Sequence, residues 1–234
     1  SPTAKVVVVE YASLSCPHCA RFHKSVFPAF RKKYIDTGKV QFVYREFITS
    51  PAEIAVPATM LARCAGKDRY FQVVDRVFAT QDEMFDDGTI AGVHRILRRE
   101  AAALGIDSAA YSACVQDEAA FEALKARGEQ ASTGDKVEGT PTFDVNGKRI
   151  EPPLGKEMDL ATLDAAIAAA MKGKGGPGLL GLFRGVNGGD WEKLETFKNY
   201  QIVIGCQALH ATGYAMGLQF DGVVGTGTDK DAAV

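Results

Sequence analysis

VVVVEYASLSCPHC, residues 6–19, joins an apolar β-branched run to two cysteines three positions apart. The run lies within residues 5–12, which predict a buried strand. Residues 17–34 predict a helix, because apolar and aromatic side chains recur at three- and four-residue spacing. Thiols at this spacing close a disulfide only where the backbone curls back, as it does in the first turn of a helix. Pro17 suits that turn because no amide donor is needed there. The stretch therefore predicts a redox dithiol at a helix start.

The two cysteines of this dithiol are expected to differ in acidity. Free backbone N–H groups and the helix dipole stabilise a thiolate at Cys16, whereas Cys19 lies one turn further in and is expected to be shielded. The dipole supplies only about 0.3–2 kcal/mol, and each unit by which a thiol pKa falls requires about 1.4 kcal/mol. We therefore expect local amides and the imidazole of His18 to lower the pKa further. A stable thiolate makes a weak disulfide, which favours an oxidant of other thiols.

The composition is that of an ordinary globular protein, with 234 residues, 46% apolar, 24% charged and a formal net charge of −2. Basic residues are scattered and the longest basic run is Arg31-Lys32-Lys33, so no nucleic acid partner is indicated. No apolar run approaches the roughly 20 residues that span a bilayer, so we expect no transmembrane segment. The chain begins without a basic and then apolar segment, so we expect any export signal to be absent from it.

The order of the predicted elements is that of an α/β protein. Strands at 5–12 and 40–47 flank the helix at 17–34, in which Pro28 should cause a kink. Residues 51–134 carry helical patterns only, at 53–65, 68–80, 89–104, 108–115 and 117–132. A hairpin at 142–151 turns at Asn146-Gly147, and a helix at 158–172 follows. These patterns predict one domain from 1–50 and 135–172, interrupted by a helical subdomain at 51–134.

The chain changes character at residue 173. Fourteen of the 62 residues in 173–234 are glycine, and hydrophobic periodicity fades. This glycine-rich C-terminal extension has no assigned function; it is a genuine extension, a disordered appendage or the product of an altered reading frame. Cys206 within it would be an odd thiol, prone to intermolecular pairing.

Two further cysteines, Cys64 and Cys114, lie in helix-like contexts. A disulfide between them would close a loop of about 50 residues and stabilise the fold by roughly 4 kcal/mol in the chain-entropy model. The alternative is two buried free thiols. The disulfide would indicate an oxidising compartment.

Two segments, Val9-Glu10-Tyr11-Ala12-Ser13-Leu14-Ser15-Cys16-Pro17-His18-Cys19 and Gly139-Thr140-Pro141-Thr142-Phe143, resemble the DsbA family of exported bacterial thiol oxidases, particularly its alphaproteobacterial members. The resemblance covers roughly residues 4–172. It implies a thioredoxin fold with an inserted helical subdomain and a protein disulfide oxidoreductase activity. By the same resemblance Cys16 is the attacking cysteine, Cys19 its buried partner, and the Pro17-His18 dipeptide sets the reduction potential.

The resemblance assigns roles to three more residues. Pro141 resembles the cis-proline that faces the disulfide, leaving the backbone at Thr140 free to pair with an extended substrate chain; the alternative is an ordinary strand-start proline. Thr140 replaces the valine of the best-known members, which weakens any transfer of their substrate preference. Glu10 resembles a partly buried acid under the dithiol that relays a proton as Cys19 reacts; the alternative is a strand-end glutamate that reaches solvent.

The resemblance also implies surroundings and partners. The expected location is the periplasm. The expected substrates are unfolded or reduced proteins, and a DsbB-like membrane protein would reoxidise the dithiol. We expect a monomer with no cofactor beyond the Cys16–Cys19 disulfide.

Several alternatives remain open from the sequence. A disulfide isomerase or reductase of the same fold is the closest, and a non-redox chaperone or binding module is another. A zinc site of Cys16, Cys19 and His23 lacks the second cysteine motif of structural zinc sites, and covalent haem requires a histidine where residue 20 is alanine. His94 and His210 have no nearby partner in sequence and are interpreted as surface or packing residues.

Overall fold

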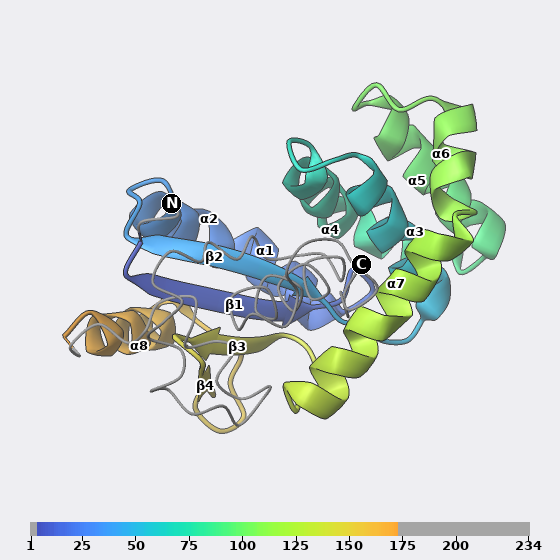
Figure 1. Cartoon of the computed structure of the whole chain (residues 1–234). Coiled ribbons are helices and arrows are strands. Elements are labelled where there is room, and N and C mark those ends of the chain that lie inside the picture. The colour runs from blue at the N-terminus through green and yellow to red at the C-terminus, as the bar shows by residue number, and fades with distance from the viewer. Residues whose placement is uncertain (1–3, 173–234) are drawn as a thin grey trace, which may run out of the picture. The chain divides into compact units, whose positions relative to one another are not determined.

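The computed structural model describes residues 4–172, whose centre is a four-stranded mixed sheet (Figure 1). Its strands β1 (Val6–Ala12), β2 (Val40–Glu46), β3 (Thr142–Val145) and β4 (Lys148–Ile150) lie in the order β2-β1-β3-β4. β1 runs parallel to β2 and antiparallel to β3. The predicted hairpin joins β3 to β4. Asn146 and Gly147 both have positive φ, as a tight hairpin turn of this kind requires.

Strand β1 is buried along its whole length because both of its faces are covered. Val6 and Val8 pack with aromatic and aliphatic side chains of α1 (Pro17–Ser25), α2 (Phe27–Phe30) and α8 (Leu160–Lys172). Val7, Val9 and Tyr11 face the other way, against residues near the end of the helical insert. This alternation places Glu10 on the same face as α1.

The helix predicted at 17–34 is interrupted rather than kinked. It ends at Ser25, restarts as α2, and continues into a π-helical turn, η1 (Arg31–Ile35). Pro28 lies in the first turn of α2, where its missing N–H costs nothing. Inside a continuous helix the same residue would leave the Lys24 carbonyl without its amide donor, so the helix ends before it.

The helical insert consists of α3 (Ala52–Cys64), α4 (Tyr70–Asp87), α5 (Ile90–Ala102), α6 (Ser108–Val115), α7 (Glu118–Glu129) and the π-helical turn η2 (Gln130–Gly134). Figure 1 shows these helices gathered together, apart from α8. α4 extends past its predicted end at residue 80 to Asp87, and Gly88, with a φ of 64°, ends it. Thr89, Asp107 and Asp117 cap the next helices through their side chains.

The insert does not have a core separate from the dithiol. Leu14, Cys16 and Cys19 belong to the same buried cluster as the apolar faces of α3, α4 and α5. A disulfide joins Cys64 of α3 to Cys114 of α6, with their Cα atoms 5.7 Å apart. The structure therefore contains the disulfide, rather than the two buried free thiols that the sequence left as the alternative.

The sequence interpretations of residues 173–234 concern a part that the structure does not describe. The glycine-rich extension at 173–234, with Cys206 and His210, lies outside the described residues. Among the helices of residues 4–172, none combines the length and apolar character needed to cross a bilayer.

Candidate active site

The dithiol lies where the loop after β1 enters α1, as predicted. Cys16 is the N-cap residue, with extended backbone angles, and its sulfur accepts a hydrogen bond from the Cys19 N–H at 3.4 Å. Pro17 occupies the first turn. Both cysteines are free thiols here, Cys16 with 6% of its surface exposed and Cys19 with none. Only the first sulfur is therefore open to attack from outside.

The environment separates the pKa values of the two thiols. A hydrogen bond from the Cys19 side chain, together with bonds from Thr140 and from the backbone N–H groups of Cys19 and His18, outweighs burial and lowers the pKa of Cys16 to about 5. Burial raises the pKa of Cys19 well above its ordinary value, and the Cys16 side chain and the charge of Glu10 add to the rise. At neutral pH the reduced site thus holds one thiolate, on Cys16, and one thiol, on Cys19.

The imidazole of His18 is not directed at this thiolate. Its Nδ1 lies 2.6 Å from the Glu157 carboxylate and 2.7 Å from the Arg21 guanidinium, in an exposed cluster. The group of His18 that hydrogen-bonds to Cys16 is the backbone N–H. Within the described structure the ring makes no hydrogen bond to the sulfur, and an effect of the imidazole on the pKa of Cys16 stays a prediction. Glu157 escaped sequence reasoning because it lies far from the dithiol along the chain.

The threonine-proline segment meets the dithiol as the resemblance implies. The Thr140–Pro141 peptide bond is cis. When neutral, the Cys16 thiol donates to the Thr140 carbonyl oxygen at 3.3 Å, across 124 positions of sequence. The backbone at Thr140 therefore lies beside the sulfur that a substrate must approach. Its pairing with a substrate chain remains a prediction.

Glu10 is fully buried and does not reach solvent. Its Oε2 lies 2.9 Å from Nε2 of His23, while its Oε1 has no hydrogen-bond partner within the described chain. The charge of Glu10 contributes to the raised pKa of Cys19, which places the carboxylate near that thiol. The burial of Glu10 excludes the interpretation of a strand-end glutamate that reaches solvent, and its proton exchange with Cys19 stays a prediction.

The other histidines of residues 4–172 have protein partners. His23, considered above as a zinc ligand, is bonded to Glu10 instead, and no group of three His, Cys, Asp or Glu side chains in the described part of the chain is placed to hold a metal. His94 of α5 contacts the Tyr111 hydroxyl, as a packing residue does.

Gln81 is a site residue that sequence reasoning missed. Its side-chain amide donates to the backbone carbonyls of Leu14 at 2.9 Å and Cys16 at 3.2 Å, and only 1% of Gln81 is exposed. The available indication was a polar residue within the apolar stripe of α4, between Phe78 and Met84. Gln81 thus supplies a donor to the Leu14 carbonyl and a second donor to the Cys16 carbonyl, which also accepts the Ala20 N–H.

The Arg21–Glu157 pair predicts opposite effects of two substitutions on the pKa of Cys16. The charge of Cys16 contributes to the raised pKa of Arg21, so Arg21 in turn favours the thiolate. Glu157→Gln leaves the Arg21 charge uncompensated and should lower the pKa of Cys16, whereas Arg21→Gln should raise it. Because both side chains are exposed, each shift should stay below about one unit.

A pH titration of the thiolate ultraviolet absorbance measures both shifts. Lys24→Gln, which removes a cation bonded to Asp82 rather than to Glu157, is the control for a general change in charge. Shifts of the same sign in the Glu157 and Arg21 variants would contradict this account of the cluster.

Comparison with known proteins defines the class. A family model described as Thioredoxin matches residues 1–168, so the chain belongs to the thioredoxin family. Within that family it is DsbA-like, as its sequence resemblance indicated. The crystal structure of alpha-DsbA1 from Wolbachia pipientis matches with a TM-score of 0.62 at 27% identity, covering 72% of this chain and 87% of that one. The inserted helical subdomain is thus part of a known architecture, and the predicted fold is confirmed.

Curated relatives include proteins from several Rickettsia species. A "Putative protein-disulfide oxidoreductase" of Rickettsia bellii is 34% identical over 170 residues, which cover 72% of this chain and 62% of the relative. A protein of the same description from Rickettsia typhi is 37% identical over 149 residues, which cover 63% of this chain and 53% of the relative. The chain thus spans about half to three-fifths of the length of these relatives.

Proposed function

We propose that this chain is a thiol:disulfide oxidoreductase that donates its Cys16–Cys19 disulfide to exported proteins through a mixed disulfide at Cys16. The observation that supports it best is the opposed acidity of the two thiols, with the pKa of Cys16 lowered to about 5 and that of Cys19 raised. A disulfide whose reduced form is stabilised in this way is a strong oxidant.

The proposed reaction has two exchange steps. A substrate thiolate attacks the Cys16 sulfur, the Cys16–Cys19 bond breaks, and Cys19 leaves and takes up a proton. A second substrate thiolate then attacks the substrate sulfur of the mixed disulfide, and Cys16 leaves as a thiolate. Two electrons pass from the substrate dithiol to the protein, and the substrate gains a disulfide. The second step is favoured because a thiol of low pKa is a good leaving group.

The site also supports an expectation about the substrate. An extended chain could pair with the half-buried backbone at Thr140, beside Cys16, and main-chain pairing places little demand on sequence. We therefore propose unfolded or reduced proteins as substrates, a periplasmic location, a DsbB-like membrane protein as reoxidant, and a monomer that needs no cofactor besides its own disulfide. The names of the Rickettsia and Wolbachia relatives agree with this class of activity.

Redox equilibrium with glutathione tests the direction of electron flow. We expect a reduction potential less negative than about −200 mV, above that of thiol reductants at about −270 mV. Reduction at pH 6–8 takes up one proton per two electrons, because Cys16 stays ionised above its pKa of about 5. The potential should therefore fall by about 30 mV for each unit of rising pH in this range, and by about 59 mV per unit below pH 5. A potential near that of the reductants would reverse the proposal.

A further inference from the structure

We propose that His23 relays protons between the buried Glu10 and a surface cavity beside α1 and α4, and so supplies the proton that Cys19 takes up. The proposal rests on the proposed disulfide exchange, since that reaction creates the demand for a proton at Cys19. His23 does not touch either sulfur and acts through Glu10.

The environment of His23 leaves one nitrogen without a protein partner. Nε2 lies 2.9 Å from Oε2 of Glu10, and Nδ1 has no hydrogen-bond partner within the described chain. The ring packs between Phe27 and Phe78, each with its centroid 4.5 Å from that of His23. Only 2% of the side chain is exposed. A buried polar nitrogen without a hydrogen-bond partner destabilises the fold. This cost is consistent with a functional role for Nδ1.

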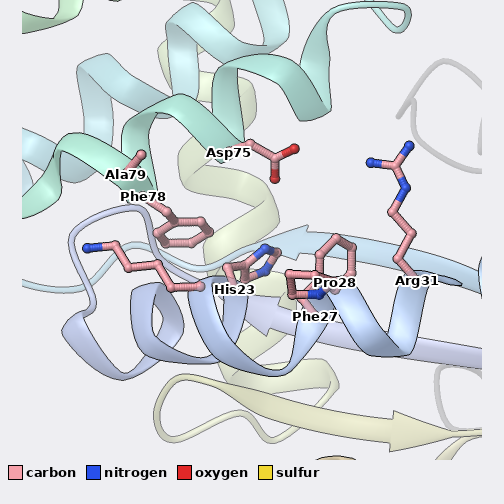
Figure 2. A pocket seen from close by; sticks show the side chains of 8 residues that line it. His23, Phe27, Pro28, Arg31, Asp75, Phe78 and Ala79 are labelled. Atoms are coloured by element: carbon pink, nitrogen blue, oxygen red, sulfur yellow. The ribbon is translucent and has the colours of Figure 1, made fainter.

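His23 lines a cavity of about 360 Å³. Figure 2 shows the ring between the two phenylalanines, with the Asp75 carboxylate above it. Lys24 and Arg31 also line the cavity. Its volume is ample for several water molecules. The imidazole that bonds to Glu10 thus also lines the cavity.

Asp75 is placed to supply protons at the outer end. It extends from α4 into the wall of the cavity. Desolvation raises its pKa, against the opposing charges of His23 and Arg31. A carboxylic acid with a raised pKa donates and recovers a proton more readily near neutral pH. Five titratable or charged side chains surround His23 or line its cavity: Glu10 of β1, Tyr44 of β2, Lys24 of α1, Arg31 of η1 and Asp75 of α4.

The relay keeps protons and electrons in balance. When the substrate sulfur bonds to Cys16, the electron pair of the broken S–S bond goes to Cys19. The Glu10 carboxylate takes a proton from Nε2 of His23 and passes it to Cys19, and Nδ1 takes one from the cavity. One proton thus enters for each Cys19 released, and none crosses the opening above Cys16. When the membrane partner restores the disulfide, the same proton leaves by the reverse route.

The test measures the single-turnover oxidation of a reduced dithiol peptide at several pH values. The disulfide form of the full chain is compared with that of its His23→Ala variant. Removing the relay should slow mixed-disulfide formation by about 100-fold at about pH 8, the low end of what a positioned proton donor contributes. The loss should shrink as pH falls, because protons then reach Glu10 more readily without the relay. Added imidazole, which fits the space vacated between Phe27 and Phe78, should restore the rate. Pyrazole, which has a similar size and is far less basic, should not.

Two further variants separate chemistry from packing. His23→Gln keeps a donor toward Glu10 and most of the side-chain volume but cannot exchange a proton, so it should be slow as well and gain nothing from imidazole. It also provides the test if His23→Ala fails to fold. His94→Gln changes a histidine of α5 that is bonded to Tyr111, and it should react like the parent.

The outcomes distinguish this proposal from the proposed function. A parent protein that does not oxidise the peptide would overturn the proposed function. An active parent with His23 variants of equal rate at every pH would overturn the relay alone. A slow His23→Ala variant whose deficit is the same at every pH and is not rescued by imidazole would show a packing role, which also overturns the relay.

Discussion

Replacing Cys16 with serine is expected to abolish disulfide transfer, lowering the rate of peptide oxidation by at least about 10³-fold, because the attacked sulfur is removed. Cys19→Ser should behave differently. It keeps the acidic Cys16 but removes the thiol that resolves the mixed disulfide, so a peptide disulfide carried by Cys16 should accumulate. Mass spectrometry under non-reducing conditions after incubation with an activated peptide disulfide measures both outcomes.

The same two variants test which of the two cysteines is the nucleophile. If Cys19→Ser lost its reactivity and Cys16→Ser formed the mixed disulfide, the nucleophile would be Cys19. The structure argues against that outcome, since Cys19 has no exposed surface and a raised pKa. A protein that bound the peptide equally well in both variants and never formed the adduct would be a binding module instead.

Removing the Cys64–Cys114 disulfide should lower the free energy of unfolding by about 4 kcal/mol, given the 50 positions between the two cysteines. In a domain of this size that corresponds to a fall in melting temperature of roughly 8–16 °C. The Cys64→Ala/Cys114→Ala variant avoids unpaired thiols, and thermal and urea unfolding followed by circular dichroism measure the loss.

The same variant should keep its peptide-oxidising activity where it remains folded, because the bridge joins α3 to α6 and neither cysteine belongs to the dithiol. The single variant Cys64→Ala is the matched comparison, since it opens the same loop and leaves one thiol free. A double variant as stable as the parent would show that the bridge constrains the unfolded chain less than the loop-entropy model assumes.

Local chemistry accounts for most of the fold that could be predicted. The valine run, the Asn146-Gly147 turn and the amphipathic patterns of the insert depend on a few neighbouring residues, so they are readable in sequence. The end of the helix at Ser25 was harder to predict, because Pro28 is compatible with either a kinked helix or a second helix that begins beside it. Only the packing of the following residues on the sheet decides between the two.

The candidate site was predictable where spacing alone sets the geometry and less so where side chains converge in space. Cys16, Pro17 and Cys19 follow from one helical turn. The contacts of His18 with Glu157 and of Gln81 with the Cys16 carbonyl join residues 139 and 65 positions apart, and no pattern within one element specifies them. Burial of Glu10 opposite His23 depends likewise on which face of β1 meets α1.

The hydrogen bonds of Gln81 limit how much of the helical insert can be removed from this protein. α4 belongs to the insert, yet its glutamine amide fills the acceptor sites of the loop that carries Cys16. A shortened chain that joined β2 directly to β3 would remove the donor to the Leu14 carbonyl and expose the apolar side of the dithiol. The insert is therefore not a detachable module, and a minimal version of this protein that keeps its chemistry must retain α4.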